Sequence, residues 1–266
     1  MTYSVGEDRF TGDFYMIALK KIKSGYVLYG KTKYDHSNGS AVFVKPRQII
    51  EVSNVQFAEK GFVIFFHEDY LAGHILHKQI KNYGYFEYEI NEALHLSPAE
   101  EVIMWELYEK IRKEYDENSD EFSREIILSH IDSILKYSDR FYKRQFSDRS
   151  NNVSGTTLKR FQAVLQTYFD KKLHLKDGLP TVNYLAGELF LSSRYLSDLL
   201  KQETGKTALE HVHIYLVTEA KNLLLGSDSS ISGIAYDLGF ESPSYFTRLF
   251  KKVAGLTPAQ FKEASN

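Results

Sequence analysis

The sequence predicts an α+β protein: a strand-rich N-terminal region, then helices, then an all-α C-terminal domain. Two observations carry this prediction. Roughly the first 95 residues group aromatic and β-branched residues into short runs separated by turn signals. The rest of the chain has apolar residues at helical spacing and contains one two-helix pattern twice. At 266 residues, the chain is long enough for two domains, each with its own core.

Composition and charge are those of an ordinary globular protein, with 43% hydrophobic and 26% charged residues. The formal net charge is −2, yet residues 155–266 hold 13 Lys or Arg against 11 Asp or Glu, a local balance of +2. This asymmetry favours nucleic-acid binding by the C-terminal part, but only weakly. Cysteine is absent, which excludes disulfides, thiolate metal sites and cysteine nucleophiles.

The N-terminus lacks the basic start and apolar run of a signal peptide. No window approaches the roughly 18 apolar residues that a membrane span needs. We therefore expect a cytoplasmic protein that does not bind membranes.

Predicted strands share aromatic and β-branched residues and cover residues 14–21, 25–31, 40–46 and 61–70. Turn signals separate them at Lys23-Ser24-Gly25, Ser37-Asn38-Gly39 and Lys60-Gly61. Short strands at this spacing predict a small barrel or a double sheet. Their aromatic side chains either line a ligand pocket or fill the core, and small barrels are usually filled.

Two helices are predicted after the strands. The first begins with a capping box in which Ser97 is the N-cap, Pro98 is the first helical residue and Glu100 is the reciprocal partner; it should end near Tyr115. The second covers residues 121–146 and has a wide apolar stripe that includes Ile127, Ile131, Ile134 and Phe141. This stripe either packs against the strands of its own domain or pairs with the same helix of a second chain, giving a homodimer.

A polar stretch, "SDRSNNVSG", follows the second helix at residues 147–155. It is rich in Ser, Asn and charge, as interdomain linkers are. The sequence therefore predicts an N-terminal domain over residues 1–146, a linker over 147–155 and a C-terminal domain over 156–266.

The duplicated pattern consists of "LAGELFLSSRYLSDLLKQETGKT" (185–207) and "IAYDLGFESPSYFTRLFKKVAGLT" (234–257). Matching positions are 49 residues apart before one inserted residue and 50 apart after it. Each copy has the features of a helix-turn-helix: a first helix with a small Ala, a short turn at Phe190 or Gly239, and a second helix N-capped by Ser192 or Ser242. Pro243 suits the first position of its helix.

Each second helix has polar side chains opposite its apolar face. A solvated surface helix is the alternative, but two copies with the same orientation favour an interface with double-stranded DNA, whose major groove admits a helix. The predicted DNA-contact residues are Ser192, Ser193, Arg194, Ser197, Asp198 and Lys201 in the first copy, and Ser242, Ser244, Tyr245, Thr247, Arg248, Lys251 and Lys252 in the second. We expect Arg248 to be the main base reader and the lysines to lie near phosphates.

Roughly residues 156–264 resemble the double helix-turn-helix domain of AraC/XylS transcription regulators. The resemblance is carried by Ile231 and "IAYDLGFESPSYFTRLFKKVAGLTPAQF", which together span residues 231–261. The resemblance implies a cupin-like N-terminal barrel that senses a small-molecule effector, a dimerising helix after it, and activation of transcription with RNA polymerase as a candidate partner. Asp198 departs from the family, where a basic or amide residue is common. Because a carboxylate repels phosphate, the first copy of the repeat either binds a distinct DNA sequence or binds DNA weakly.

Enzymatic and metal chemistry are not predicted. His74 and His77 lack the His-x-His spacing of cupin enzymes, so we expect no catalytic residues, no metal and no cofactor. Three functions remain in order of preference. The first is a DNA-binding regulator that senses a small molecule and dimerises. The second is such a regulator without a small-molecule ligand, whose N-terminal domain dimerises or binds a protein partner. The third is a cupin-type enzyme fused to a DNA-binding domain.

Overall fold

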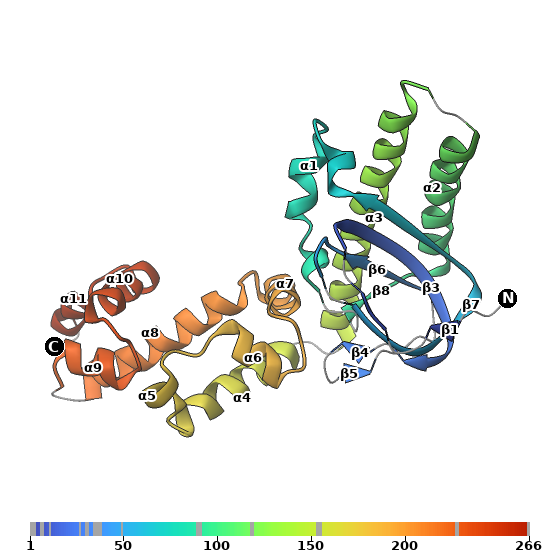
Figure 1. Cartoon of the computed structure of the whole chain (residues 1–266). Helices are drawn as coiled ribbons and strands as arrows, with labels where there is room; N and C mark the ends of the chain where they lie inside the picture. Colours follow the sequence, from blue (N-terminus) through green and yellow to red (C-terminus); the bar gives the residue numbers. More distant parts are fainter. Residues whose placement is uncertain are drawn as a thin grey trace. The chain divides into compact units, whose positions relative to one another are not determined.

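The computed structural model describes residues 4–5, 8–10, 12–26, 28–29, 32–33, 39–48, 50–88, 92–117, 120–152, 156–226 and 229–264. The chain divides into two compact units, residues 1–149 and 150–266 (Figure 1). The division falls within the segment 147–155, and helix α3 (Ser123–Asn152) continues through most of that segment. None of the described helices combines the length and apolar character that crossing a bilayer requires.

An antiparallel sheet with strand order β1-β7-β3-β6-β8 forms the base of the first unit (Figure 1). Its strands are β1 (Ser4–Val5), β2 (Asp8–Phe10), which pairs with β7 off this path, β3 (Phe14–Tyr26), β6 (Ser40–Val44), β7 (Ile50–His67) and β8 (Leu94–His95). Two short strands, β4 (Leu28–Tyr29) and β5 (Thr32–Lys33), form a separate pair. The sheet is open within the described residues, so the predicted closed, cupin-like barrel is corrected to an open sheet.

The predicted turns at Lys23-Ser24-Gly25 and Lys60-Gly61 are both wrong, because β3 continues through the first and β7 through the second. Gly61 pairs with Lys20 of β3, and the register between the two strands shifts directly beyond this pair. A Cβ atom on Gly61 would lie 2.8 Å from the carbonyl oxygen of Leu19. The glycine therefore permits the close approach of two long strands rather than a change of chain direction. Ser37 and Asn38 of another predicted turn lie outside the described residues.

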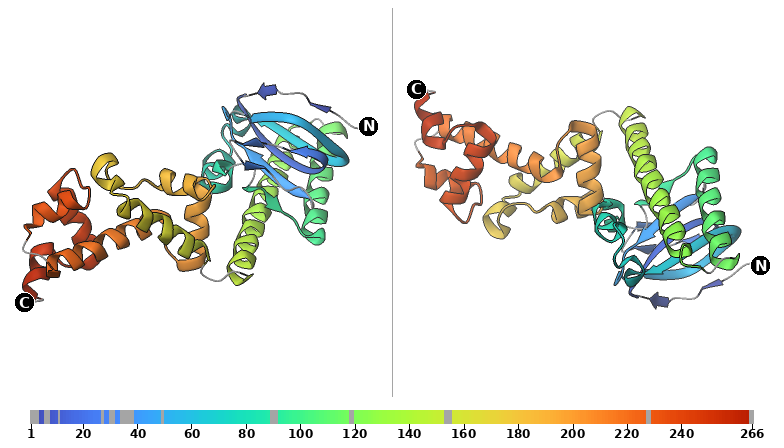
Figure 2. Two further views of the ribbon diagram at one scale, coloured as in Figure 1. Left: turned by 90° about the horizontal axis from the view of Figure 1, so that it is seen from below. Right: turned by 90° about the horizontal axis from the view of Figure 1, so that it is seen from above.

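Short helical turns and then two long helices follow β7. The short ones are η1 (Glu68–Leu71), α1 (Leu76–Gln79), η2 (Ile80–Asn82) and η3 (Gly84–Glu87). The long ones, α2 (Pro98–Glu117) and α3, lie over one face of the sheet (Figure 2). This arrangement gives the first unit its two layers, with the core between them.

The capping box at the start of α2 is confirmed. The Ser97 N–H donates to Glu100 Oε2 at 2.8 Å, and the Glu100 N–H donates to Ser97 Oγ at 3.3 Å. Glu100 has a second function that its spacing did not reveal. Arg144 of α3 donates to Oε1 and Oε2 of this carboxylate at 2.7 and 2.9 Å. This ion pair stabilises the packing of α3 against the start of α2.

The α3 side chains predicted to dimerise are buried inside the first unit. Ile127, Ile131, Ile134 and Phe141 are only 8%, 1%, 0% and 4% exposed. The Tyr85 hydroxyl also donates to the Leu135 carbonyl of α3 at 2.9 Å, which ties the helix to η3. Their burial agrees with the alternative that the stripe packs within its own unit. Dimerisation through α3 stays a prediction, and it would need other side chains of the helix.

The aromatic strand residues divide between core and surface. Tyr15, Phe43, Phe62 and Phe66 are buried, whereas Phe14 and Phe65 are 48% and 58% exposed. Phe62 stacks on Tyr108 of α2 with ring centroids 4.3 Å apart, and its edge meets Trp105. Aromatic packing of this kind joins the sheet to α2. The side chains of Tyr26 and Tyr29 lie outside those that the structure describes.

Helices are the only regular secondary structure in the described residues of the second unit. Its helices are α4 (Thr156–Asp170), α5 (Leu173–Asp177), α6 (Val182–Glu188), α7 (Ser193–Thr204), α8 (Ala208–Gly226), α9 (Ile231–Asp237), α10 (Pro243–Ala254) and α11 (Pro258–Ala264). Helix α8 connects the two copies of the repeat and packs against both α7 and α10.

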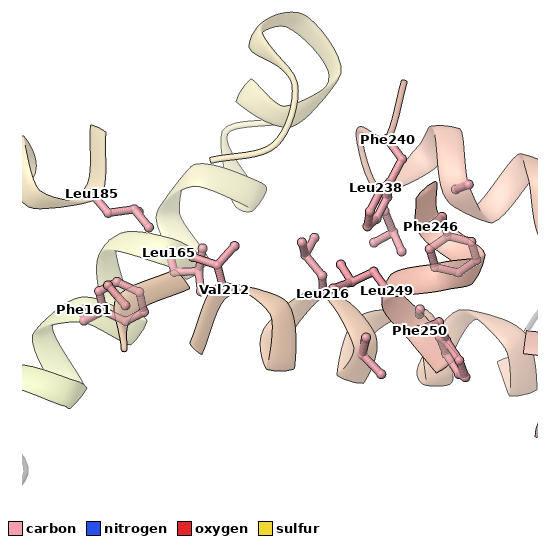
Figure 3. Packing of buried hydrophobic residues seen from close by; sticks show 14 of the residues in the cluster. Phe161, Leu165, Leu185, Val212, Leu216, Leu238, Phe240, Phe246, Leu249 and Phe250 are labelled. Carbon is pink, nitrogen blue, oxygen red and sulfur yellow. The ribbon is translucent and has the colours of Figure 1, made fainter. Parts of the chain in front are cut away.

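One continuous hydrophobic core runs along α8. Figure 3 shows Phe161, Leu165 and Leu185 gathered around Val212 of α8, and the second copy gathered around Leu216 farther along the helix. The second copy contributes Leu238, Phe240, Phe246, Leu249 and Phe250. Because both copies share this buried helix, their second helices are held on one scaffold.

Candidate nucleic-acid interface

The two copies of the repeat have the same backbone hydrogen bonds across their turns. The Leu191 N–H donates to the Ala186 carbonyl at 2.9 Å, and the Phe240 N–H donates to the Ala235 carbonyl at 3.0 Å. The two donors are 49 residues apart, and so are the two acceptors, which is the spacing of the sequence repeat. The duplication of sequence is therefore a duplication of structure.

A residue with positive φ occupies the same position in both turns: Phe190, with φ 59°, and Gly239, with φ 87°. Gly239 confirms the sequence prediction, whereas a bulky residue such as Phe190 rarely adopts this conformation. A Cβ atom on Gly239 would lie 2.6 Å from the carbonyl oxygen of His174 in α5. Phe190 is 64% exposed. The second turn thus requires glycine because α5 lies against it, while the first accommodates a side chain directed toward solvent.

The second helix of each copy is capped as the sequence predicts. Ser192 Oγ accepts from the Tyr195 N–H at 3.2 Å, and Ser242 Oγ accepts from the Tyr245 N–H at 3.4 Å. Helices α7 and α10 each contain 12 residues. Both end at a glycine with positive φ, Gly205 in one and Gly255 in the other. Glu241 is the residue inserted before the second cap.

The predicted DNA-contact residues all lie outside the buried core. Those classed as exposed are Arg194, Lys201, Ser242, Ser244, Tyr245, Arg248, Lys251 and Lys252, and those partly buried are Ser192, Ser193, Ser197, Asp198 and Thr247. The apolar faces are buried, with Leu196 and Leu200 in α7 and Phe246 and Phe250 in α10. One equivalence in the sequence does not hold in space: Tyr195 is 0% exposed, whereas its counterpart Tyr245 is 42% exposed.

The two helices differ in charge at their exposed faces. In α7, Arg194 Nε donates to Asp198 Oδ2 at 2.9 Å, one helical turn away. In α10, no carboxylate of the described residues forms an ion pair with Arg248, Lys251 or Lys252. The exposed face of α10 is therefore the more positive of the two.

A shallow hollow of about 460 Å³ lies between the start of α9 and the start of α10. Ser232 of α9 lines it together with Ser244, Thr247 and Arg248 of α10. Ser232 is not among the residues predicted from the sequence, although the repeat could have indicated it. Its equivalent in the first copy is Asn183, which accepts a hydrogen bond from Ser193 Oγ at 3.3 Å.

Residues 185–264 match a family described as a helix-turn-helix domain. The chain carries a helix-turn-helix domain of the AraC type. The matched range includes both copies of the repeat, from α6 to the end of α11.

Relatives of this helix-turn-helix chain include regulators from bacteria. The uncharacterized transcriptional regulatory protein YesN of Bacillus subtilis (strain 168) is 41% identical over 76 residues, 28% of this chain and 21% of YesN. The uncharacterized HTH-type transcriptional regulator YfiF of the same strain is 25% identical over 259 residues, 94% of this chain and 76% of YfiF. The HTH-type transcriptional activator RhaR of Yersinia pestis bv. Antiqua (strain Angola) is 37% identical over 73 residues, 27% of this chain and 25% of RhaR. The chain thus spans only about a fifth of YesN and a quarter of RhaR.

Solved structures with some similarity include the C-terminal domain of AraT, a response regulator from Geobacillus stearothermophilus. It has 27% identity, a TM-score of 0.36, and coverage of 42% of this chain and 87% of that chain. ToxT from Vibrio cholerae O395 has 16% identity, a TM-score of 0.32, and coverage of 98% of this chain and 95% of ToxT.

Proposed function

We propose that the protein is a sequence-specific transcription regulator that reads double-stranded DNA with α7 and α10. One observation carries the proposal. Two helices of equal length follow the same hydrogen-bonded turn, share a core along α8, and keep their polar faces outside that core. A helix presented in this way fits the major groove, where base edges can be distinguished.

Helix α10 makes the dominant contacts in this proposal. Arg248 is exposed and has no ion pair with any described residue, so its guanidinium is available for a bidentate contact with guanine. The Thr247 hydroxyl donates to the Pro243 carbonyl at 2.9 Å within the helix. Because the hydroxyl is used within the helix, the methyl group of Thr247 is the part of the side chain that can make an apolar contact with thymine. Ser244 and Tyr245 lie on the first turn of α10, and Ser244 lines the hollow together with Ser232.

In this proposal, helix α7 contributes less to DNA affinity than α10, or contributes mainly to sequence selectivity. Its only arginine, Arg194, is already bonded to Asp198. The pair is neutral as a whole, so it adds little to phosphate attraction, but Asp198 holds the guanidinium in one orientation. Ser193 and Ser197 supply further polar groups beside Arg194. This arrangement supports readout of a distinct sequence by the first copy of the repeat.

Contacts with phosphate would give affinity without sequence preference. We assign them to Lys201, Lys251 and Lys252, and to the backbone N–H groups behind the Ser192 and Ser242 caps. The assignment predicts a marked dependence of binding on salt concentration, because each neutralised phosphate releases counterions.

The experiment that tests the proposal begins with footprinting of genomic DNA by the purified full chain to define an operator. Gel-shift titrations with single-base variants of that operator then compare Arg248→Ala with Lys251→Ala. Arg248→Ala should lose about 1–3 kcal/mol of discrimination at one base pair, since a bidentate contact with guanine is worth that much. Lys251→Ala should weaken binding to every variant alike. Equal losses on all variants for Arg248→Ala would refute its role, and no protected site would refute the proposal itself.

Further parts of the proposal concern the whole protein. Activation rather than repression, with RNA polymerase as a partner, is supported by the similarity to a relative named as an activator. The first unit is proposed to sense a small molecule and to form a homodimer. Sedimentation velocity of the full chain tests the dimer: a single monomeric species at micromolar concentration would exclude it.

A further inference from the structure

A pocket of about 580 Å³ lies in the first unit, where the end of β7 meets α2 and α3. Ile64 and Phe66 of β7 line it, with Ile111 of α2 and Ile131 of α3. Among the described residues, the part of β7 from Gly61 to His67 pairs only with β3. The pocket therefore lies at a free edge of the open sheet, closed by the two helices rather than by further strands.

The walls of the pocket are mainly apolar and aromatic. Besides the aliphatic residues, three tyrosines contribute: Tyr70 of η1, and Tyr108 and Tyr115 of α2. Tyr108 is held by its stacking on Phe62 at 4.3 Å, whereas Tyr115 is 78% exposed. Small-molecule sites typically enclose about 300–1,000 Å³ and combine such walls with a few polar groups. The size and lining of this pocket match that description.

Charges beside the pocket disfavour an anion. Arg112, the one arginine in its described lining, donates to Glu109 at 2.7 and 2.9 Å, so its charge is already compensated. Asp116 also lines the pocket, and its carboxylate lies close enough to interact electrostatically with Arg112. Together, the three groups carry a net negative charge. The Arg124 guanidinium already lies over the Tyr70 ring, 5.7 Å from its centroid, and Arg124 is paired with Glu125 at 3.6 Å, so this charge is compensated too. Faces of tyrosine rings attract cations.

We propose that this pocket binds a small aromatic molecule bearing an amine, with an uncharged analogue bound less tightly and an anionic one least. The ring system would lie against Phe66 and Tyr108, and the ammonium group would lie toward Asp116. That this pocket is the effector site of a regulator rests on the proposed function. Binding itself does not depend on that function.

The protein contains its own reporter of the pocket. Trp105 is the only tryptophan in the chain. Its ring lies 5.7 Å from Tyr108, which lines the pocket, and 5.2 Å from Phe62. A ligand packed on Tyr108 should therefore change the emission of Trp105, which can be excited selectively.

The experiment titrates the full chain with 4-biphenylmethylamine, 4-biphenylmethanol and 4-biphenylacetate while tryptophan emission is recorded. We expect saturable changes, with the amine binding at least threefold more tightly than the alcohol and at least tenfold more tightly than the acetate. Asp116→Asn, a surface change, should bring the amine and the alcohol to within twofold of each other. No saturable change with any probe, or acetate binding as tightly as the amine, would overturn the proposal.

A blocking variant tests the location. Val63 of β7 lines the pocket, so Val63→Phe should weaken the amine at least tenfold. The control makes the same change at Val253 of α10, 37% exposed in the other unit, and should leave the affinity unchanged. An unaltered affinity in a folded Val63→Phe protein would refute this site, and Asp116→Asn remains decisive if that variant does not fold. Gel-shift assays on the same preparations measure DNA binding separately, so failure of the pocket and failure of the DNA-binding proposal are distinguishable.

Discussion

Replacing Gly239 by alanine tests how the two turns of the repeat are built. Gly239 has φ 87°, and a Cβ atom there would lie 2.6 Å from the His174 carbonyl oxygen and 3.1 Å from the His174 Cβ. Both effects act in the folded state, because an unfolded alanine avoids the left-handed region and does not meet α5. The substitution should therefore destabilise the second unit without removing any side chain.

The size of the effect follows from three contributions. A left-handed conformation costs an alanine about 1–2 kcal/mol. The close contact adds the cost of displacing a backbone oxygen of α5. The stiffer unfolded chain offsets about 0.4–1 kcal/mol. We expect a net loss of at least about 1 kcal/mol, which lowers the urea midpoint by roughly 0.5 M for an m-value near 2 kcal/mol/M.

Phe190→Gly is the matched variant, since Phe190 holds the same position in the first turn with φ 59°. The change to glycine stabilises the folded state by removing the cost of the left-handed conformation, and it buries little less surface. It also destabilises the fold by making the unfolded chain more flexible. The net change should be about 0 to 1 kcal/mol in favour of the folded state. Urea unfolding of the full chain, followed by circular dichroism, measures both variants. Emission of Trp105 reports unfolding of the first unit separately, and its urea midpoint should be the same in both variants as in the wild type.

The reasoning would be refuted if Gly239→Ala unfolded at the wild-type urea concentration. It would also be refuted if Phe190→Gly lost as much stability as Gly239→Ala, because the two turns would then not differ in what lies against them. A parallel shift in the Trp105 transition would show that the effect is not local to the second unit.

Three further predictions follow from the contacts described above. Asp198→Asn should remove the carboxylate that pairs with Arg194 and so raise affinity for all DNA sequences, with a slope of log K against log salt steeper by up to about 0.9 in gel shifts. Arg144→Met should leave the Glu100 carboxylate without its ion-pair partner and destabilise the first unit by about 1–3 kcal/mol, given the partial exposure of the pair, as measured by Trp105 emission in urea. Burial lowers the pKa of three histidines of the second unit, His174, His211 and His213. The folded state then binds fewer protons than the unfolded one, so unfolding free energy should fall as pH drops below about 6.5, and a pH-independent urea midpoint between pH 7.5 and 5 would contradict this.

Local features of the second unit could be predicted from the sequence. The N-caps at Ser192 and Ser242, the positive φ of Gly239 and the start of α10 at Pro243 each depend on residues a few positions apart. Such features are encoded by hydrogen-bonding side chains and backbone preferences within one turn of chain. Because the same local features occur twice, the sequence also predicted the repeat and the placement of its polar residues outside the core.

Features that depend on distant partners could not be read in this way. Gly61 has the appearance of a turn residue, yet it lies within β7 because β3 approaches closely there. Tyr195 and Tyr245 are equivalent in sequence, but only the first is enclosed by neighbouring helices. Phe190 gave no signal of its left-handed conformation, since propensity alone argues against it.

By itself, the sequence determined that the chain contains two copies of a helix-turn-helix, because caps, turns and helical periodicity are local. Only the tertiary structure decided that the N-terminal sheet is open over its described strands, that the apolar stripe of α3 is buried in its own unit, and that a pocket forms beside β7. These properties depend on which surfaces meet across the fold. An apolar stripe shows that a helix face will be buried, but the partner that buries it is set by packing between segments far apart in the chain.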